Sequence, residues 1–240
     1  MYKIKKLFPL LVPPIIGIII KKIFLQNRGE ELLFDYENNF YNRIAFIQKA
    51  INQFDSNICS YLEIGVNTNT VFDALPLPMQ NKIGVDPFLG GTHRMTSDEY
   101  FENNKRKFDV IFIDGLHTYE QCQKDLINSL NVLNSDGIIL LHDLLPRTNL
   151  EAEVPQKQRT WSGDIWKVAV ELNSSLNIDF KIINIDRGIG VVKPKKNYKY
   201  IKNSELHNQN FNDFYKKYFL RLPIISCEEG FNFIHQNKNV

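Results

Sequence analysis

Cysteine is scarce in this sequence: 3 of the 240 residues are cysteine, and no two of them stand in a C-x-x-C spacing. Thiolate zinc sites and the disulfide frameworks of small secreted proteins both need a richer pattern of cysteines. The sequence therefore supports neither, and a reducing compartment fits best. With 43% hydrophobic and 23% charged residues, the composition is that of an ordinary globular protein, which excludes collagen-like and wholly disordered chains.

A hydrophobic run long enough to cross a membrane is also missing. The apolar stretch at residues 7–20 is interrupted by three prolines and followed by Lys21 and Lys22. As a helix it would reach about 21 Å, short of the hydrocarbon core of about 30 Å. Lysines rather than a small-residue cleavage site follow it, which disfavours a secretory signal. We therefore predict a basic, apolar membrane-interface segment at residues 1–28. The alternative is a helix packed on its own domain or on a second subunit.

Acidic residues are absent from the first 22 positions, which hold five lysines. The other 24 lysines and arginines stand against 27 acids, so the bulk of the chain is mildly acidic although its formal net charge is +2. This balance argues against a general nucleic-acid binder. We predict a cytoplasmic protein, held peripherally on the inner face of the membrane through residues 1–22.

Apolar runs and helical patterns alternate along the middle of the chain. The runs typical of buried strands are 60–65, 82–86, 108–114 and 137–143. The runs 178–185 and 188–192 are so closely joined that they indicate a hairpin. Strands separated by helices predict an α/β fold with a doubly wound, mostly parallel sheet, and the hairpin adds one antiparallel strand.

Helical patterns flank this alternation on both sides. Residues 30–54 carry Phe40, Ile44, Ile47 and Ile51 at spacings of three and four, which predicts one amphipathic face. The chain after residue 194 is rich in Lys, Asn and Tyr, with one plausible helix at 212–219. We therefore predict a central domain at 29–194 and a helical extension at 195–240.

Polar residues stand where the predicted strands end. They are Glu63, Asp86, Asp114 and the pair His142 and Asp143. Ligands bind beyond the carboxyl ends of the strands in doubly wound sheets. Any one of these residues is also explained as a helix cap or as a solvated loop residue, whereas four strands that end alike favour a binding site.

The strings FDVIFIDGLHTYE at 108–120 and GIILLHD at 137–143 resemble class I S-adenosylmethionine-dependent methyltransferases. The branch is that of the metal-dependent O-methyltransferases of sugars and macrolide glycosides, and the resemblance covers residues 61–194. It implies a Rossmann-like, seven-stranded sheet whose last strand is antiparallel, in agreement with the hairpin.

The resemblance implies S-adenosyl-L-methionine as the cofactor. In the family's pattern Glu63 orients the methionine ammonium, Gly65 allows the backbone a close approach, and Asp86 accepts hydrogen bonds from the ribose hydroxyls. Asn67 and Asn69 replace further glycines of that pattern; asparagine is the next most tolerant residue of positive φ. The cofactor set implied is Glu63, Gly65, Asn67, Asn69, Thr70, Asp86, Ser97, Asp98, Asp114 and His117, with Ser97 and Asp98 at the adenine. A plain connection between strand and helix is the alternative for the loop.

A metal site is predicted from Asp114, His142 and Asp143, which end neighbouring strands. Two carboxylates and an imidazole suit Mg²⁺ or Mn²⁺. The ion would acidify the acceptor hydroxyl. His117 is then the candidate base, because its ordinary pKa lies near 6.5; binding of the cofactor or capping of the next helix explains it equally well. The predicted catalytic residues are His117, His142 and Asp114.

A long polar loop at 144–163 follows the fourth strand directly. Loops of this length in compact domains are often lids or binding loops. We expect Arg147, Lys157 and Arg159 to meet phosphates of a nucleotide-linked or lipid-linked sugar, and Trp161 to stack on a sugar face. A solvated loop without a ligand is the alternative.

These patterns together predict an O-methyltransferase that acts on a hydroxyl of a sugar or glycan precursor in the biosynthesis of a surface polysaccharide. One alternative is a catalytically silent scaffold of the same fold at the membrane. An NAD-dependent oxidoreductase is disfavoured, because no G-x-G-x-x-G follows the first strand.

Overall fold

The computed structural model describes residues 32–235 of the chain. The chain divides into two units, Met1–Asp35 and Tyr36–Val240, and the second contains the whole sheet. The predicted membrane-interface segment at 1–28 lies outside the described residues. Within residues 32–235, no helix has both the length and the apolar character needed to cross a membrane.

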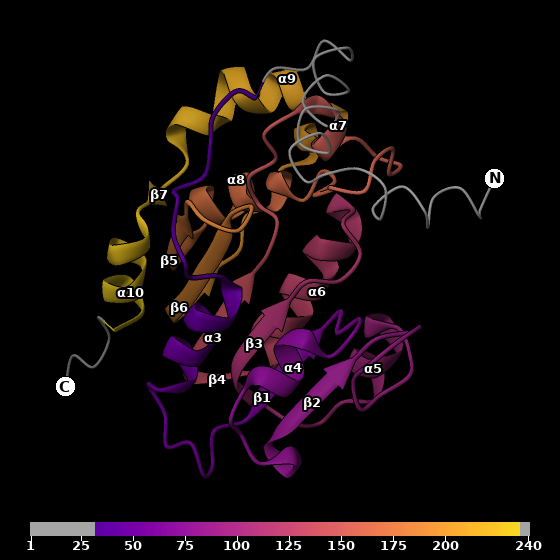
Figure 1. Ribbon diagram of the computed structural model, residues 1–240, viewed down its shortest axis with the longest axis vertical. Helices are drawn as coiled ribbons and strands as arrows, with labels where there is room; N and C mark the ends of the chain where they lie inside the picture. Colours follow the sequence, from indigo (N-terminus) through magenta and orange to yellow (C-terminus); the bar gives the residue numbers. More distant parts are fainter. Residues whose placement is uncertain (1–31, 236–240) are drawn as a thin grey trace, which may run out of the picture. The chain divides into compact units, whose positions relative to one another are not determined.

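One seven-stranded sheet forms the centre of the second unit, with strand order β2-β1-β3-β4-β6-β5-β7 (Figure 1). The strands are β1 (Tyr61–Ile64), β2 (Lys82–Val85), β3 (Phe108–Ile113), β4 (Leu133–Leu141), β5 (Leu176–Ile183), β6 (Ile189–Lys199) and β7 (Ile224–Ile225). β2, β1, β3 and β4 pair in parallel. The predicted α/β fold with a mostly parallel sheet is therefore confirmed.

The antiparallel strand is β6, which runs against both of its neighbours, β4 and β5. The prediction that the last strand is antiparallel was wrong in this detail, because a seventh strand follows along the chain. β7 pairs in parallel with the outer side of β5. It has two residues, too few to produce a strand pattern in the sequence.

Helices cover both faces of the sheet (Figure 1). They are α3 (Arg43–Ile51), α4 (Thr70–Ala74), α5 (Ser97–Asn103), α6 (Tyr119–Val132), α7 (Asn149–Ala152), α8 (Trp166–Ser174), α9 (Phe211–Asp213) and α10 (Cys227–His235). Shorter turns are η1 (Met79–Asn81), η2 (Ser204–Asn208), the π-helix η3 (Phe214–Tyr218) and η4 (Phe219–Arg221).

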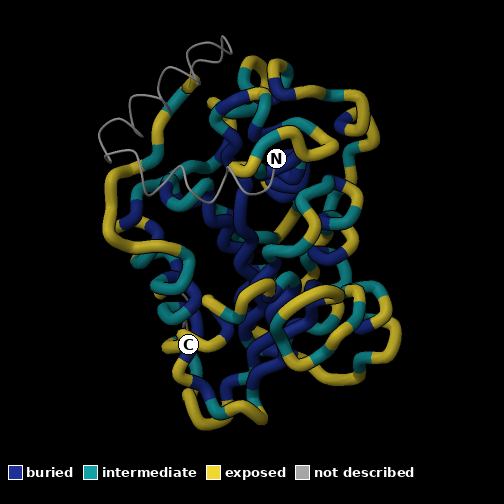
Figure 2. The backbone as a smooth tube through the Cα atoms, turned by 45° about the vertical axis from the view of Figure 1, so that its right-hand side comes forward, coloured by how far each residue is buried: buried dark blue, intermediate teal, exposed yellow. Residues whose placement is uncertain are grey.

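Alternate side chains of the central strands point to opposite faces of the sheet and pack in a separate core on each face. Phe112 and Leu140 pack in one buried cluster with Phe46 and Ile47 of α3. Their strand neighbours point to the opposite face, where α6 contacts β3 and β4. The central strands β1 and β3 consequently lie in the buried interior, and exposed segments lie outside them (Figure 2).

Helix α3 is shorter than the pattern at 30–54 predicts. The Asn42 side chain accepts a hydrogen bond from the backbone N–H of Ile44, so the helix starts at Arg43. Ile47 and Ile51 are buried as predicted, whereas Phe40 precedes the helix and is fully exposed. The helix cap at Asn42 lies inside the periodic pattern, so Phe40, one of its four apolar residues, stays outside the helix.

The chain after residue 194 is not wholly helical. β6 continues through the predicted domain boundary to Lys199, and β7 adds a strand further on. The predicted helix at 212–219 is built from α9, η3 and the start of η4 rather than from one regular α-helix.

Candidate active site

Asp114 and His142 stand side by side because their strands are parallel neighbours in register. Ile113 of β3 pairs with Leu141 of β4, and the backbone N–H of His142 donates to the carbonyl of Ile113. The next residue of each chain therefore leaves the sheet at the same place. This is the carboxyl edge at which ligands of such sheets bind.

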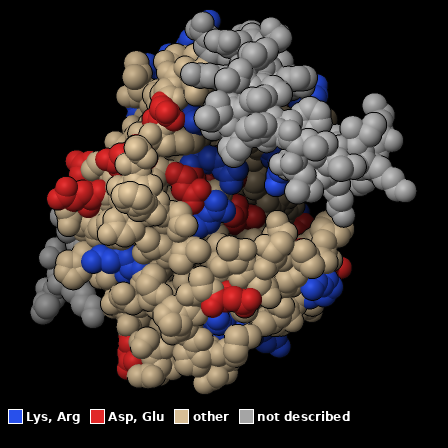
Figure 3. Space-filling view, in the orientation of Figure 1, with Lys and Arg blue, Asp and Glu red and all other residues tan. Residues whose placement is uncertain are grey.

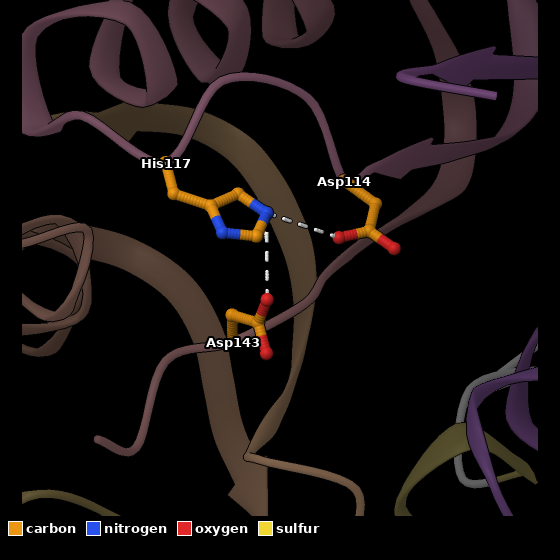
Figure 4. Close-up of side chains that lie close together, drawn as sticks. All are labelled: Asp114, His117 and Asp143. Atoms are coloured by element: carbon orange, nitrogen blue, oxygen red, sulfur yellow. Dashed lines mark ion pairs between the residues drawn. The ribbon is translucent and has the colours of Figure 1, made fainter. Parts of the chain in front are cut away.

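His117, three residues after Asp114, faces both carboxylates of this edge (Figure 4). Its Nε2 lies 3.5 Å from Oδ1 of Asp114 and 3.4 Å from Oδ2 of Asp143. Its Nδ1 lies 2.9 Å from the backbone carbonyl of Trp161. A carbonyl oxygen only accepts, so Nδ1 carries the hydrogen. Nε2 is thus the atom available to a proton or a metal ion.

One group of side chains in the described part of the chain has the spacing of a metal site: Asp114, His117 and Asp143, whose ligand atoms lie within 4.8 Å of one another. The predicted set had His142 in place of His117. The imidazole of His142 lies instead among three carboxylates, with no exposed side-chain surface. Its Nδ1 is 3.1 Å from Asp114 and 3.3 Å from Asp143, and its Nε2 is 3.4 Å from Asp186.

The surroundings of His142 favour its imidazolium form. Burial alone lowers the pKa of His142, but Asp114 and Asp143 outweigh that effect and hold the pKa well above its ordinary value. Burial likewise raises the pKa of Asp114, whereas His142, His117 and Arg43 hold it well below the ordinary value. The two side chains therefore form a buried ion pair.

Three charged residues of this site were not predicted: Arg43, Asp186 and Arg187. Arg43 lies 3.0 Å from Asp114 and 2.9 Å from Asp186, and Arg187 contacts Asp143. The sequence marked Asp186 and Arg187 only as a hairpin turn, and both have positive φ there. Figure 3 shows acidic and basic side chains side by side around a hollow on one face.

Asp86 joins the two loops that the cofactor prediction involves. Its Oδ1 accepts from the backbone N–H groups of Phe88 and Leu89, and its Oδ2 accepts from that of Asn67. The Asn69 side chain accepts from the backbone N–H of Gly91. The loop after β1 is thereby tied to the loop after β2.

Gly65 lies where the backbone after β1 passes close to the backbone after β3, so a larger residue would not fit. It has a φ of +85°, and a Cβ there would lie 2.2 Å from the backbone oxygen of Asp114. Glu63, two residues earlier, is 1% exposed and accepts a hydrogen bond from Tyr61 at 2.7 Å. Burial, together with the charge of Asp114, raises the pKa of Glu63 to about 8.

The two residues predicted at the adenine lie together at the start of α5. Gln121 of α6 donates to Oγ of Ser97, to Oδ1 of Asp98 and to Oδ1 of Asp125. Asp125 is a buried acid that the prediction missed, and burial raises its pKa to about 6. The remaining predicted residue, Thr70, is exposed and begins α4.

The loop at 144–163 brings Trp161 to His117, with ring centroids 5.2 Å apart. Trp161 is anchored by its indole N–H, which donates to the carbonyl of Glu153. Arg147 pairs with Glu151 and lies over the ring of Tyr36, whereas Lys157 pairs with Glu153 in solvent. Arg159 is exposed.

Comparison with known proteins indicates which class of enzyme this chain resembles. Residues 82–144 match the family model described as a methyltransferase domain. The match spans Asp86, Asp114, His117 and Asp143, and it confirms the predicted class of enzyme, a methyltransferase. The comparison with curated proteins gave no match.

Several solved structures are similar in fold. An O-methyltransferase from Bacillus cereus in complex with SAH is 11% identical, with a TM-score of 0.47 over 80% of this chain and 96% of its own. An SAH-bound methyltransferase from Podospora anserina is 15% identical, with a TM-score of 0.47 over 63% and 77%. A methyltransferase from Geobacter sulfurreducens is 9% identical, with a TM-score of 0.46 over 81% and 97%. At these identities the similarity concerns the fold alone.

The burial of Glu63 predicts a specific pH dependence of stability. Between about pH 5 and pH 8 its carboxyl is protonated in the folded protein and ionised in the unfolded chain. The free energy of unfolding therefore falls as the pH rises. The free energy of unfolding of Glu63→Gln, relative to that of wild type, should therefore rise by about 1.4 kcal/mol per pH unit in this window. Urea unfolding at pH 5, 6, 7 and 8 measures the gain.

The matched control is Glu102→Gln, which changes an exposed acid of α5. Its difference from wild type should stay constant with pH. A constant difference for Glu63→Gln as well would show that Glu63 ionises normally in the folded protein.

Proposed function

We propose that this protein is an S-adenosylmethionine-dependent O-methyltransferase that acts on a hydroxyl of a sugar or glycan precursor with the help of a divalent cation. The observation that carries the proposal is the position of Asp114. Its backbone lies against Gly65 of the proposed cofactor loop, and its carboxylate faces His117. One residue thus joins a cofactor site to a proton-accepting and cation-binding group.

The cofactor supplies an activated methyl group when it is bound. Glu63 in its ionised form would hold the ammonium end, and Asp86 would accept from the ribose hydroxyls. Asp86 has acceptor capacity left for this role, because each carboxylate oxygen has two lone pairs and Oδ2 accepts one backbone N–H. Ser97 and Asp98 would face the adenine.

The residues present fit a divalent cation. Among residues 32–235, both oxygens of Asp143 are buried without a hydrogen-bond donor of suitable geometry, although Arg187 lies against one of them. One ligand atom of each of Asp114, His117 and Asp143 lies within 4.8 Å of the other two. Two carboxylates and an imidazole suit Mg²⁺ or Mn²⁺. A bound ion lowers the pKa of a coordinated hydroxyl.

His117 can also serve as the base. Burial lowers its pKa, but Asp114, Asp143 and the Trp161 carbonyl outweigh burial and raise the pKa above its ordinary value. Nε2 of His117 would be a ligand when the cation is bound, and without the cation it would accept the proton of the hydroxyl. His142 is held as an imidazolium by its three carboxylates and keeps Asp114 and Asp143 in place.

The acceptor is proposed to bind beside Trp161. An indole next to the reacting edge offers a flat apolar surface to a sugar ring. The loop that carries Trp161 follows β4 directly, so it lies at the edge where Asp143 emerges. This position supports a glycan acceptor at the same edge.

Residues 1–22 are proposed to hold the enzyme at the cytoplasmic face of a membrane. The support is in the sequence, which combines an apolar stretch with five lysines and no acid. Such a position suits an enzyme that modifies a surface polysaccharide or its lipid-linked precursor.

Replacing Asp86 with Ala should weaken the binding of S-adenosylhomocysteine at least tenfold. Each lost charge-assisted hydrogen bond is typically worth about 1.5 to 3 kcal/mol, and tenfold corresponds to about 1.4 kcal/mol. Isothermal calorimetry measures the affinity, with the exposed Asp73→Ala in α4 as the matched control. Equal affinity of Asp86→Ala and wild type would remove Asp86 from the cofactor site. Wild-type protein that binds neither S-adenosylmethionine nor S-adenosylhomocysteine would favour the silent scaffold.

Excess chelator should stop methyl transfer, and Mg²⁺ or Mn²⁺ should restore it, because a bound ion would acidify the acceptor hydroxyl. The assay follows the labelled methyl group of S-adenosylmethionine into a panel of nucleotide sugars and polyprenyl-linked sugars. Asp143→Asn should lose the restoration by metal while it still binds S-adenosylhomocysteine. Full turnover in chelator would instead give His117 the role of a metal-free base.

Deletion of residues 1–22 should release the protein from anionic liposomes. Apolar burial contributes roughly 25 cal/mol per Å², and each nearby lysine contributes about 1 kcal/mol on an anionic surface. Sedimentation with neutral and anionic vesicles at two salt concentrations separates the two contributions, because salt screens only the second. Sedimentation that deletion does not change would contradict the membrane assignment.

A further inference from the structure

Arg43 is fixed at the first position of α3 by a single carboxylate. Its Nε and Nη2 donate to Oδ2 and Oδ1 of Asp186, each at 2.9 Å. Its backbone N–H also donates to Oδ2 of Asp186, at 3.0 Å. The guanidinium is therefore held in one orientation at both ends, by a fork of the kind that only arginine makes.

The remaining guanidinium nitrogen reaches the candidate active site. Nη1 of Arg43 donates to Oδ2 of Asp114 at 3.0 Å. The other oxygen of Asp114, Oδ1, is the one that faces the imidazoles of His117 and His142. The two oxygens of Asp114 thus have different partners, and Arg43 decides which oxygen is left for a ligand.

We propose that Arg43, held by Asp186, is a positioning residue that limits Asp114 to one oxygen toward the cation and lowers the affinity of the site for that cation. The inference rests on the cation site of the proposed function. It adds a residue that is 71 positions away from Asp114 in the sequence and does not itself touch the ion.

The sign of the effect follows from charge. The side chains of Arg43 and Asp114 are 23% and 16% exposed, so solvent screens their interaction only partly. Removal of the positive charge of Arg43 leaves the negative charges of Asp114 and Asp186 less balanced. It also leaves Oδ2 of Asp114 without its guanidinium donor. A divalent cation should then bind at least tenfold more tightly. A residue that only supported the fold would have the opposite effect, or none.

The test is a titration of the full chain with Mn²⁺ alone. Electron paramagnetic resonance measures the concentration of free Mn²⁺ at each point of the titration. Arg43→Gln and Arg43→Met both remove the charge and should both bind Mn²⁺ at least tenfold more tightly than wild type. Arg43→Lys keeps the charge and should stay within a few-fold of wild type. The matched control is Lys49→Gln, which removes a charge from the last turn of the same helix and should leave Mn²⁺ affinity unchanged.

Thermal unfolding, measured on the same samples, shows that each variant is folded, and S-adenosylhomocysteine affinity tests the cofactor site separately. Mn²⁺ binding to Arg43→Gln and Arg43→Met that equals or falls below that of wild type would overturn the role of Arg43 alone. Absence of Mn²⁺ binding in every variant, with S-adenosylhomocysteine still bound, would overturn both this inference and the cation in the proposed function. Absence of S-adenosylhomocysteine binding with the Mn²⁺ pattern intact would overturn only the methyltransferase activity.

Discussion

Three carboxylates, those of Asp114, Asp143 and Asp186, are gathered in a partly buried space at the carboxyl edge of the sheet. Burial of like charges is costly unless opposite charges are supplied at contact distance. The chain supplies them from three places: His142 directly after β4, Arg43 from α3 and Arg187 from the β5–β6 hairpin. The ion pairs that balance this negative charge therefore join α3, the first helix of the second unit, to residues that follow β4 and to the β5–β6 hairpin.

The position of His142 follows from that requirement. Both of its ring nitrogens face carboxylates, so its imidazolium form balances the third negative charge. A histidine whose two ring nitrogens both face carboxylates keeps those carboxylates oriented. His117 has one carbonyl partner at Nδ1 and leaves Nε2 directed at Asp114 and Asp143. Two histidines at one sheet edge thus have different chemistry because of their partners.

The sequence predicted what depends on local pattern and could not predict what depends on topology. The strands β1, β2, β3 and β4 were found because buried parallel strands are continuous apolar runs. Arg43 and Asp186 are 143 residues apart, and they meet only because β6 turns back beside β4 and carries the hairpin to the start of α3. No periodicity encodes that contact. β7 was missed because two residues carry no pattern.

The loop after β1 keeps the backbone shape of a glycine-rich turn although asparagines stand at two of its positions. Asn67 and Asn69 adopt φ values of +52° and +62°, which glycine would otherwise supply. The close approach is made by the facing loop, where a Cβ on Gly90 would lie 2.2 Å from the oxygen of Asn67. Asn69 adds a hydrogen bond to Gly91 that a glycine cannot make. The two loops are therefore held together by the protein's own hydrogen bonds, so both are ordered before any ligand binds.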